Sequence, residues 1–296
     1  MTERPSAALP TVVLLGDGRH HEIVQIAEAR ISPFDRGFLF GDGVYEATRV
    51  FDGFPVAMDA HVARLDRSLR ELGIRGFDPA SYPDIIDRLL AAEGVRDASV
   101  YLQITRGIEI PRRHVPGADL VPTVFAFAMP LPPLDSITAI ETVDAILAPD
   151  DRWLRTDIKS LNLLANVMAA VRGHATGAAE TILHRDGLVS EGTHSTILAV
   201  IDDVLVAPAT TAAPAILPGT MRPLVLDAAR AAGIAIRERA LTVAELRTAT
   251  EIGIASSNRL LHAVGHLEGR AVPGGPWMQR LLDTMVDSIR AAITAR

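Results

Sequence analysis

The sequence contains no cysteine and only one lysine, and both features restrict its chemistry. Without cysteine the chain can have no disulfide, no thiolate metal site and no cysteine nucleophile. Of its 29 Lys+Arg residues 28 are arginine, and the one lysine is Lys159. A GC-rich genome that favours arginine codons accounts for this bias, but not for the lysine that was kept. Because lysine can lose its proton and act as a nucleophile whereas arginine stays charged, Lys159 is the first candidate for a catalytic residue.

Long hydrophobic runs and an excess of positive charge are missing as well. The net charge is −7, which gives no support for nucleic-acid binding. No apolar run approaches the roughly 18 residues that a membrane-spanning helix needs, and the N-terminal sequence lacks the pattern of a signal peptide. Hydrophobic residues make up 48% of the chain, enough for a folded core. We therefore expect a soluble, cytoplasmic, globular protein with neither nucleic-acid nor membrane partners.

What the sequence does contain is a mixture of strand-like and helix-like patterns. In the first half they predict strands at 11–15, 22–26, 44–51, 99–107 and 123–129, and helices at 61–74 and 83–92. In the second half they predict a strand at 141–148, a helix from Leu161, hairpins turning at Asp186-Gly187 and Asp202-Asp203, and helices at Met221–Ala232 and Trp277–Thr294. The mixture is neither a regular βαβ alternation nor all-β, and it predicts an α+β fold.

A proline-rich stretch divides the chain near its middle. The prolines of residues 130–133 (PLPP) can continue neither a helix nor a central strand. We predict an N-terminal α+β domain at 1–132, a linker at 133–137 and a C-terminal domain at 138–296.

The neighbours of Lys159 suggest how its amine is activated. Apolar positions from Leu161 onward fit one face of a helix, and Ser160 suits the N-cap. Lys159 then lies just outside the positive end of the helix dipole, where loss of its proton is favoured.

Five segments, in chain order, are similar to the motifs of one enzyme family. Residues 157–166 (DIKSLNLLAN) resemble the cofactor-lysine segment of the fold-type IV pyridoxal-phosphate enzymes, and most of all that of D-amino-acid aminotransferases. The other matches are 35–46 (DRGFLFGDGVYE), 103–107 with 111–114 (QITRG, PRRH), 189–192 (VSEG) and 216–222 (ILPGTMR). The resemblance implies a smaller N-terminal α/β domain that carries a substrate-carboxylate loop. It also implies a larger, barrel-like mixed α/β C-terminal domain that binds pyridoxal 5'-phosphate.

The resemblance assigns a role to each residue at the cofactor. Lys159 matches the lysine that holds the cofactor as a Schiff base (internal aldimine) and moves the proton. Glu191 matches the carboxylate that keeps the ring nitrogen protonated. The implied remaining cofactor ligands, mostly at the phosphate, are Arg64, Leu217, Thr220, Met221, Ser256 and Ser257.

A second set of residues matches the trap for the substrate carboxylate. By resemblance it consists of Arg112 and His114 with the hydroxyl of Tyr45, and arginine binds a carboxylate through two parallel hydrogen bonds. Pro111 and Pro116 on either side restrict the loop backbone. The implied reaction is a ping-pong transamination of D-amino acids, such as D-alanine or D-glutamate. The acceptor is 2-oxoglutarate or pyruvate, and the enzyme is a homodimer.

Several residues depart from the family pattern and keep alternatives open. Arg49 occupies a position where branched-chain L-amino-acid aminotransferases and aminodeoxychorismate lyases also carry arginine, so these activities are the main alternative. A protein that only binds the cofactor is another. His194, Arg259 and the displaced hydroxyl of Thr220 leave the substrate range open. The histidines show no metal-ligand spacing, so we expect no metal.

Overall fold

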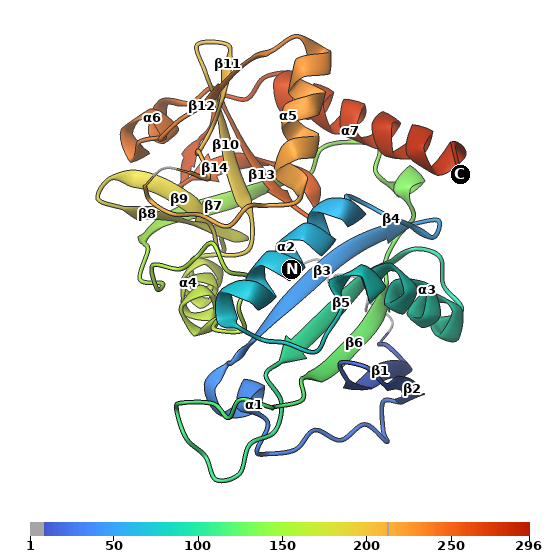
Figure 1. Cartoon of the computed structure of the whole chain (residues 1–296). Coiled ribbons are helices and arrows are strands. Elements are labelled where there is room, and N and C mark those ends of the chain that lie inside the picture. The colour runs from blue at the N-terminus through green and yellow to red at the C-terminus, as the bar shows by residue number, and fades with distance from the viewer. Residues whose placement is uncertain (1–8, 212) are drawn as a thin grey trace. The chain divides into compact units, whose positions relative to one another are not determined.

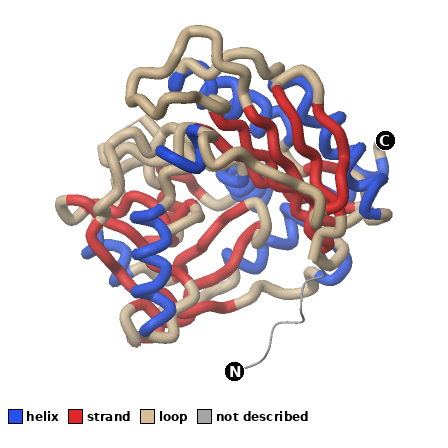
Figure 2. The backbone as a smooth tube through the Cα atoms, turned by 90° about the horizontal axis from the view of Figure 1, so that it is seen from below, coloured by secondary structure: helices blue, strands red, loops and turns tan. Residues whose placement is uncertain are grey.

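The computed structural model describes residues 9–211 and 213–296, which form two compact units (Figures 1 and 2). The first unit extends to Ser136 and includes the segment Ile158–Asn162. The second consists of Ile137–Asp157 and Leu163–Arg296. Each unit combines helices with its own sheet, which confirms the predicted α+β class.

The first unit is built on a six-stranded antiparallel sheet in the order β2-β1-β6-β5-β3-β4. Its strands are β1 (Val12–Asp17), β2 (His21–Gln25), β3 (Gly43–Phe51), β4 (Phe54–Pro55), β5 (Ala98–Thr105) and β6 (Thr123–Pro130). Its helices are α1 (Arg36–Phe40), α2 (Met58–Leu72) and α3 (Tyr82–Glu93), with the 3-10 turns η1 (Pro79–Ser81) and η2 (Leu134–Ser136). The strands and helices predicted for this half are confirmed, with small shifts at their ends.

The core of the first unit lies between the sheet and the helices α2 and α3 (Figure 1). Leu65 of α2 and Ile86 of α3 are fully buried in one cluster with Leu102 of β5. Alternate residues of β6 are buried, as expected for a strand with one face on a core. Neighbouring residues of a strand therefore face either this core or the opposite side of the sheet, and this alternation separates the site residues of β3.

The second unit contains a mixed, curled sheet with the strand order β12-β11-β10-β13-β14-β7-β8-β9, and β15 pairs with β14 (Figure 1). Its strands are β7 (Thr142–Pro149), β8 (Glu180–Arg185), β9 (Leu188–Gly192), β10 (Thr196–Ile201), β11 (Val204–Ala207), β12 (Ala235–Glu238), β13 (Glu251–Ser256), β14 (Leu260–Leu267) and β15 (Arg270–Ala271). The turns at Asp186-Gly187 and Asp202-Asp203 have positive φ at both residues, so the two predicted hairpins are confirmed.

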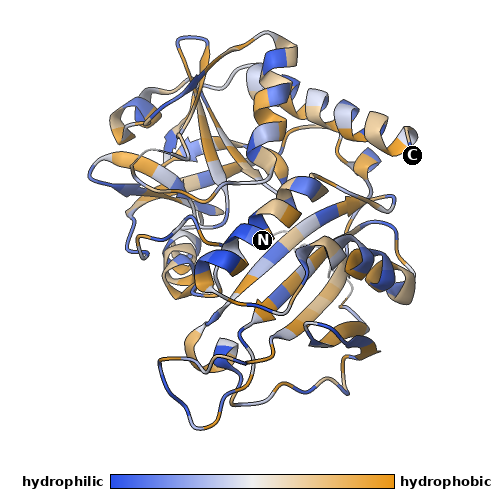
Figure 3. Cartoon of the chain, viewed as in Figure 1, coloured by the Kyte–Doolittle hydropathy of each residue, from blue (hydrophilic) through white to orange (hydrophobic). Residues whose placement is uncertain are grey.

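Four helices accompany this sheet: α4 (Leu164–Ala175), α5 (Met221–Ala232), α6 (Val243–Thr248) and α7 (Trp277–Thr294). The predicted bounds of α5 and α7 are confirmed. The helix α7 buries Leu281, Leu282 and Met285, whereas hydrophilic residues occupy its other side (Figure 3). None of the helices in the described part of the chain is long and apolar enough to cross a membrane.

The segment around Lys159 does not begin a helix. It runs extended beside β3, where the N–H of Tyr45 donates to the carbonyl of Lys159 (3.1 Å) and Ser160 forms a bridge with Val44. This backbone pairing replaces helical hydrogen bonds, so α4 begins only at Leu164 and has no side-chain cap. The predicted N-cap at Ser160 is therefore wrong, and the helix-dipole argument for Lys159 does not apply.

The same pairing explains why Ile158–Asn162 packs with the first unit although both flanking segments belong to the second. The first residues of β3 have β5 on one side only, and β4 pairs just with Val50 and Phe51. The open edge at the start of β3 thus accepts the passing chain as an additional strand. The prediction of one continuous C-terminal domain at 138–296 therefore differs from the structure, in which Ile158–Asn162 packs with the first unit.

The apolar face predicted for α4 lies on the outside. Leu164 is 73% exposed and Val171 61%, and Val167 and Met168 between them are also exposed. The helix buries its small residues Ala169 and Gly173 instead, next to β8. A periodic pattern tells which side of a helix is apolar, but it does not tell what covers that side.

Candidate active site

Lys159 lies on the face of the first sheet that the helices do not cover. Its Nζ is 4.0 Å from the centroid of the Tyr45 ring, a cation–π distance. The Tyr45 ring stacks on Tyr101, which in turn stacks on Phe127, with centroids 5.7 and 5.2 Å apart. The backbone N–H of Lys159 donates to the Oγ of Ser68 (3.3 Å), so the segment is held from α2 as well as from β3. Two residues with predicted roles, Lys159 and Tyr45, are thus brought together.

Arg64, the predicted phosphate ligand, is held by a carboxylate from the neighbouring strand. Its Nε and Nη2 donate to the two oxygens of Glu46 at 2.8 and 2.7 Å. The Nδ1 of His61 donates to the same carboxylate at 2.6 Å. Glu46 is completely buried, since it follows Tyr45 on β3 and points to the opposite face.

The charges of this cluster are well balanced. Burial by itself raises the pKa of Glu46, but the charge and hydrogen bonds of Arg64, with the His61 bond, lower it to about 2. Burial lowers the pKa of His61, whose Nε2 has no partner among the described residues. Sequence reasoning missed Glu46 and His61. The available signal was an acidic residue at a buried position of β3, between Val44 and Thr48.

The substrate-carboxylate residues of the loop after β5 lie against α1. The guanidinium of Arg112 is 4.3 Å from the ring centroid of Phe40, and the His114 ring is 5.5 Å from it. Both Arg112 and His114 are exposed. The structure brings these two predicted residues together on one aromatic side chain, whereas Tyr45 of the same predicted trap lies beside Lys159.

In the second unit, Glu191 is part of a buried ion chain. One of its oxygens pairs with Arg152, and the other accepts the N–H of Leu217 (3.2 Å). Arg152 also binds both oxygens of Asp150 at 2.9 Å, and Ser190 donates to Asp150 at 2.9 Å. The predicted residues Glu191 and Leu217 are therefore adjacent, while Arg152 and Asp150 were missed because no pattern linked them to Glu191.

This chemistry fits a protonated pyridine nitrogen at Glu191. Burial raises the pKa of Glu191 and the nearby charge of Asp150 adds to this, although the charge and hydrogen bond of Arg152 and the N–H of Leu217 oppose it. An additional cation next to Glu191 would complete the balance of charge. The carboxylate therefore suits a ring N–H of the cofactor class that the sequence implies.

The predicted phosphate ligands of the second unit also fit an anion. Thr220 precedes α5, makes no side-chain cap, and has its Oγ1 3.4 Å from the Oγ of Ser257, the residue after Ser256 at the end of β13. At the start of α5 the N–H of Met221 suits such an anion, whereas Arg222 donates its N–H to the carbonyl of Gly219 (3.2 Å) and Pro223 has no N–H. A side chain at Gly219 would collide with Thr196, because a Cβ would lie 2.4 Å from its Oγ1. The lack of a side chain at Gly219 therefore allows the chain before α5 to pass close to Thr196.

The residues that departed from the family pattern have defined surroundings. The side chain of His194 is 51% exposed and contacts Thr193 at 2.9 Å. Arg259 lies 3.9 Å from the buried Glu180, which accepts hydrogen bonds from Thr193 and Ser195 and so fixes the turn after Glu191.

Arg49 is buried in the first unit. Its guanidinium lies 4.3 Å from the centroid of the Phe51 ring and donates to the carbonyl of Pro132. In this position it is engaged by its own unit rather than exposed.

The chain is similar to known aminotransferases along most of its length. Residues 43–266 match the family model for amino-transferase class IV. A D-alanine aminotransferase from Bacillus licheniformis is 39% identical over 255 residues, which is 86% of this chain and 88% of that protein. A hypothetical aminotransferase from Mycobacterium tuberculosis, solved in a PLP-bound form, is 27% identical with a TM-score of 0.79 and covers 96% of this chain and 100% of its own. A branched-chain aminotransferase from Thermoproteus uzoniensis shares the fold, with a TM-score of 0.82 at 23% identity over 97% of this chain and 95% of its own.

Proposed function

The chain belongs to the class IV aminotransferase family, and from this premise we propose that it transfers the amino group of D-amino acids to 2-oxo acids. Its cofactor is pyridoxal 5'-phosphate. The observation that carries the proposal is the position of Lys159, the only lysine of the chain, with its amine beside the Tyr45 ring. The D specificity is supported by the match to D-alanine aminotransferases over 86% of the chain.

The residues that we assign to the cofactor have separate tasks in this proposal. When bound, the cofactor supplies an aldehyde carbon and an electron-accepting ring. The Nζ of Lys159 would hold that carbon in the resting enzyme and, once the substrate amine had replaced it there, would take the proton from the substrate Cα and return it to that carbon. The Glu191 carboxylate keeps a proton on the ring nitrogen. As phosphate ligands we propose Thr220, Met221, Ser256 and Ser257 of the second unit and Arg64 of the first. Leu217, whose N–H donates to Glu191, is proposed as a cofactor contact beside that carboxylate.

The substrate carboxylate is fixed by Arg112 and His114 with the Tyr45 hydroxyl. A bidentate arginine orients the carboxylate, and with it the Cα–H bond that must face the base. We propose D-alanine or D-glutamate as donor and pyruvate or 2-oxoglutarate as acceptor. Because both substrates carry this carboxylate, one trap serves both halves of a ping-pong reaction.

The alternative activities are branched-chain L-amino-acid transamination and aminodeoxychorismate cleavage. Their support in the sequence is Arg49. In the structure this side chain is buried against Phe51 and Pro132, so it is not presented to a substrate. The D-amino-acid reaction therefore remains our conclusion.

We further propose a cytoplasmic homodimer. The exposed apolar face of α4, which includes Leu164, Val167 and Val171, suits burial against a second copy of the chain.

A half-reaction assay tests the proposed function. The holoenzyme is mixed with D-alanine or with L-leucine, without acceptor, and the visible absorbance of the bound cofactor is followed. We expect D-alanine to remove this absorbance and release pyruvate, and L-leucine to do so at least about a hundredfold more slowly, as differential substrate binding of a few kcal/mol allows. A faster reaction with L-leucine would favour the alternative. Lys159→Ala should abolish the reaction, and Arg96→Gln, which breaks an exposed ion pair with Asp52, should leave it unchanged.

A further inference from the structure

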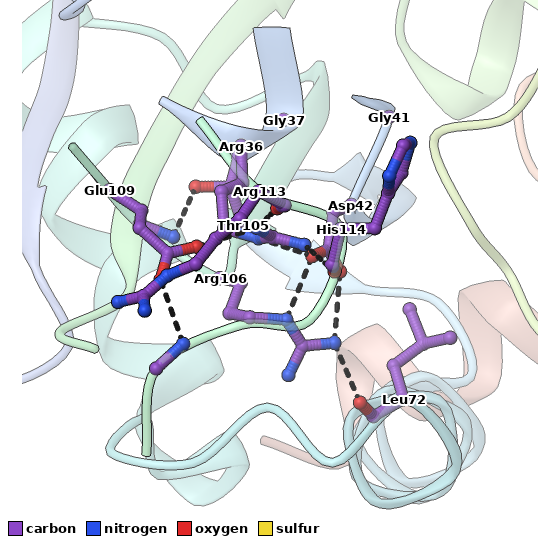
Figure 4. A network of polar contacts seen from close by, with 12 residues as sticks. Arg36, Gly37, Gly41, Asp42, Leu72, Thr105, Arg106, Glu109, Arg113 and His114 are labelled. Atoms are coloured by element: carbon purple, nitrogen blue, oxygen red, sulfur yellow. Dashed lines mark hydrogen bonds and ion pairs between the residues drawn. The ribbon is translucent and has the colours of Figure 1, made fainter. Parts of the chain in front are cut away.

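The loop that carries Arg112 and His114 is held by a buried arginine far from it in sequence (Figure 4). Arg36, the first residue of α1, is only 4% exposed. Its Nη1 donates to the carbonyl of Arg113 at 2.7 Å and its Nη2 to the carbonyl of His114 at 3.0 Å. These hydrogen bonds fix the backbone of the two residues that follow Arg112.

Two carboxylates hold Arg36 in turn. Its Nη1 pairs with Glu109 at 2.7 Å and its Nε with Asp42 at 2.8 Å. Asp42 also binds Arg106, whose Nη2 reaches the carbonyl of Leu72 at the end of α2 (2.8 Å). The anchor of the loop is thereby connected to the helix α2 and not to the loop alone.

The Glu109 carboxylate joins two parts of the loop by hydrogen bonds. Its side chain is 3% exposed, and its second oxygen accepts the Nε of Arg113 and the N–H of Gly117, both at 2.8 Å. The carboxylate of Glu109, a residue before the Arg112–His114 pair, thus binds Arg113 between the two and Gly117 after them. Burial raises the pKa of Glu109, but the bonds from Arg113, Gly117 and Arg36 outweigh this and leave that pKa below its ordinary value.

The same pairing leaves Arg112 available for an anion. Glu109 is engaged by Arg36 and Arg113, and Asp42 by Arg36 and Arg106. In the part of the chain that the structure describes, Arg112 forms no ion pair and rests only on the Phe40 ring. An arginine beside carboxylates that are already occupied keeps its full attraction for a substrate carboxylate.

Phe40 is a shared platform. Arg36 lies 4.8 Å and Arg112 4.3 Å from its ring centroid, and His114 lies 5.5 Å from it. The anchor and the two loop residues of the trap therefore touch one side chain of α1. A shift of Arg36 would displace both the loop backbone and the surface on which the trap rests.

We infer that Arg36, secured by Glu109, is a positioning residue that sets the affinity of this site for the carboxylate of amino acids and 2-oxo acids. It touches no substrate and acts through the carbonyls of Arg113 and His114 and through Phe40. The inference rests on the proposed function, because it takes Arg112 and His114 as the carboxylate trap. It predicts a loss in carboxylate binding without a loss in the chemical step.

Donors with and without a carboxylate provide the test. In the holoenzyme, Arg36→Gln should raise the KM for D-alanine and for the 2-oxo acid about tenfold and leave kcat within about threefold, since a displaced binding group weakens binding on that scale. D-phenylglycine and benzylamine differ by the carboxylate alone, so the ratio of their half-reaction rates should fall about tenfold, with the benzylamine rate unchanged. Tryptophan fluorescence should report an unchanged cofactor Kd.

Two further variants keep the test decisive if Arg36→Gln folds poorly. Glu109→Gln preserves the size of the side chain but removes its charge, and should lower the same ratio about threefold. Arg36→Lys, which cannot reach two carbonyls and two carboxylates at once, should give an intermediate effect. Arg96→Gln is the control and should change nothing.

The outcomes separate this inference from the proposed function. In the Arg112→Ala background, Arg36→Gln should cause no further fall in the ratio, because both changes act on one trap. An additive effect, or an equal fall in the benzylamine rate, would overturn the inference while Arg112→Ala alone still raises the KM. A wild-type enzyme inert toward D-alanine would overturn the proposed function as well, and is recognised before any variant is made.

Discussion

Two buried ion clusters, one in each unit, both pair a carboxylate with an arginine, but the two residue types have opposite roles. In the first, the carboxylate Glu46 holds the cation Arg64, which is assigned to the cofactor phosphate. In the second, the cation Arg152 holds the carboxylate Glu191, which is assigned to the cofactor ring. In both, the residue that would meet the cofactor is kept in place by a partner of opposite charge, from another segment of the chain.

The two carboxylates differ in how fully the protein balances their charge. Both oxygens of Glu46 receive hydrogen bonds from Arg64, and His61 adds another, which leaves its pKa at about 2. Glu191 shares Arg152 with Asp150, and burial raises its pKa. A fully balanced carboxylate is suited to holding a side chain in place, whereas an incompletely balanced one is suited to receiving a cationic ligand.

Breaking the second cluster should have the largest effect. Arg152→Gln leaves Asp150 and Glu191 buried without their shared cation, and we expect the free energy of unfolding of the apoenzyme to fall by about 3–5 kcal/mol. Urea denaturation measures it. Arg155→Gln, which weakens an exposed pair with Asp157, should cost less than about 1 kcal/mol. Equal effects of the two variants would show that burial does not govern this cluster.

Breaking the first cluster should have a smaller effect on stability and a specific effect on the cofactor. Glu46→Gln keeps one acceptor for Arg64, so we expect a loss of about 1–3 kcal/mol in unfolding free energy. The cofactor Kd, measured by tryptophan fluorescence, should rise about tenfold because Arg64 is less well held. Asp52→Asn, at the exposed pair with Arg96, is the control. An unchanged Kd in Glu46→Gln would refute the positioning role of the carboxylate.

The pH dependence of the unfolding free energy should differ in sign between the two clusters. These changes should be smaller than those expected for the Arg152→Gln and Glu46→Gln substitutions. Folding lowers the pKa of Glu46 from 4.5 to about 2, so its contribution is present at neutral pH and is lost as the pH falls through that window. Between pH 7 and pH 4 the loss is about 1 kcal/mol, and Glu46→Gln should remove it. Folding raises the pKa of Glu191, so its contribution is present at low pH and disappears as the pH rises through the raised value. Urea denaturation of the wild type, Glu46→Gln and Glu191→Gln at pH 4, 5 and 7 measures both contributions. The same direction of change with pH for the two would contradict the prediction.

The sequence predicted the elements of both units well, because their hydrophobic periods and turn residues are local signals. It failed at Ser160, where the open edge of β3 draws in a segment whose own pattern favours a helix. It also left open that the apolar side of α4 is exposed at Leu164, because periodicity identifies a face but not its partner.

At the site, resemblance gave roles to the residues that would meet the ligands and gave none to those that hold them, although Arg36 and Glu46 lie inside the matched segment 35–46. Arg64 and Glu191 were identified by their neighbours in the chain. Glu46 pairs with Arg64 across 18 residues, and Arg152 with Glu191 across 39 residues. Only the fold brings such residues together, and a single sequence carries no signal for the pairing. The link from Arg36 to the loop at His114, across 78 residues, is of the same kind.

Reduction of the holoenzyme with borohydride identifies the residue that holds the cofactor, because it fixes the cofactor covalently to that amine. The chain contains one lysine, so a peptide map has a single side chain to find. The account predicts the label on the peptide with Lys159, stoichiometric in the wild type and absent from Lys159→Ala. A cofactor bound at full occupancy but labelled only at the N-terminal amine, or not at all, would contradict it.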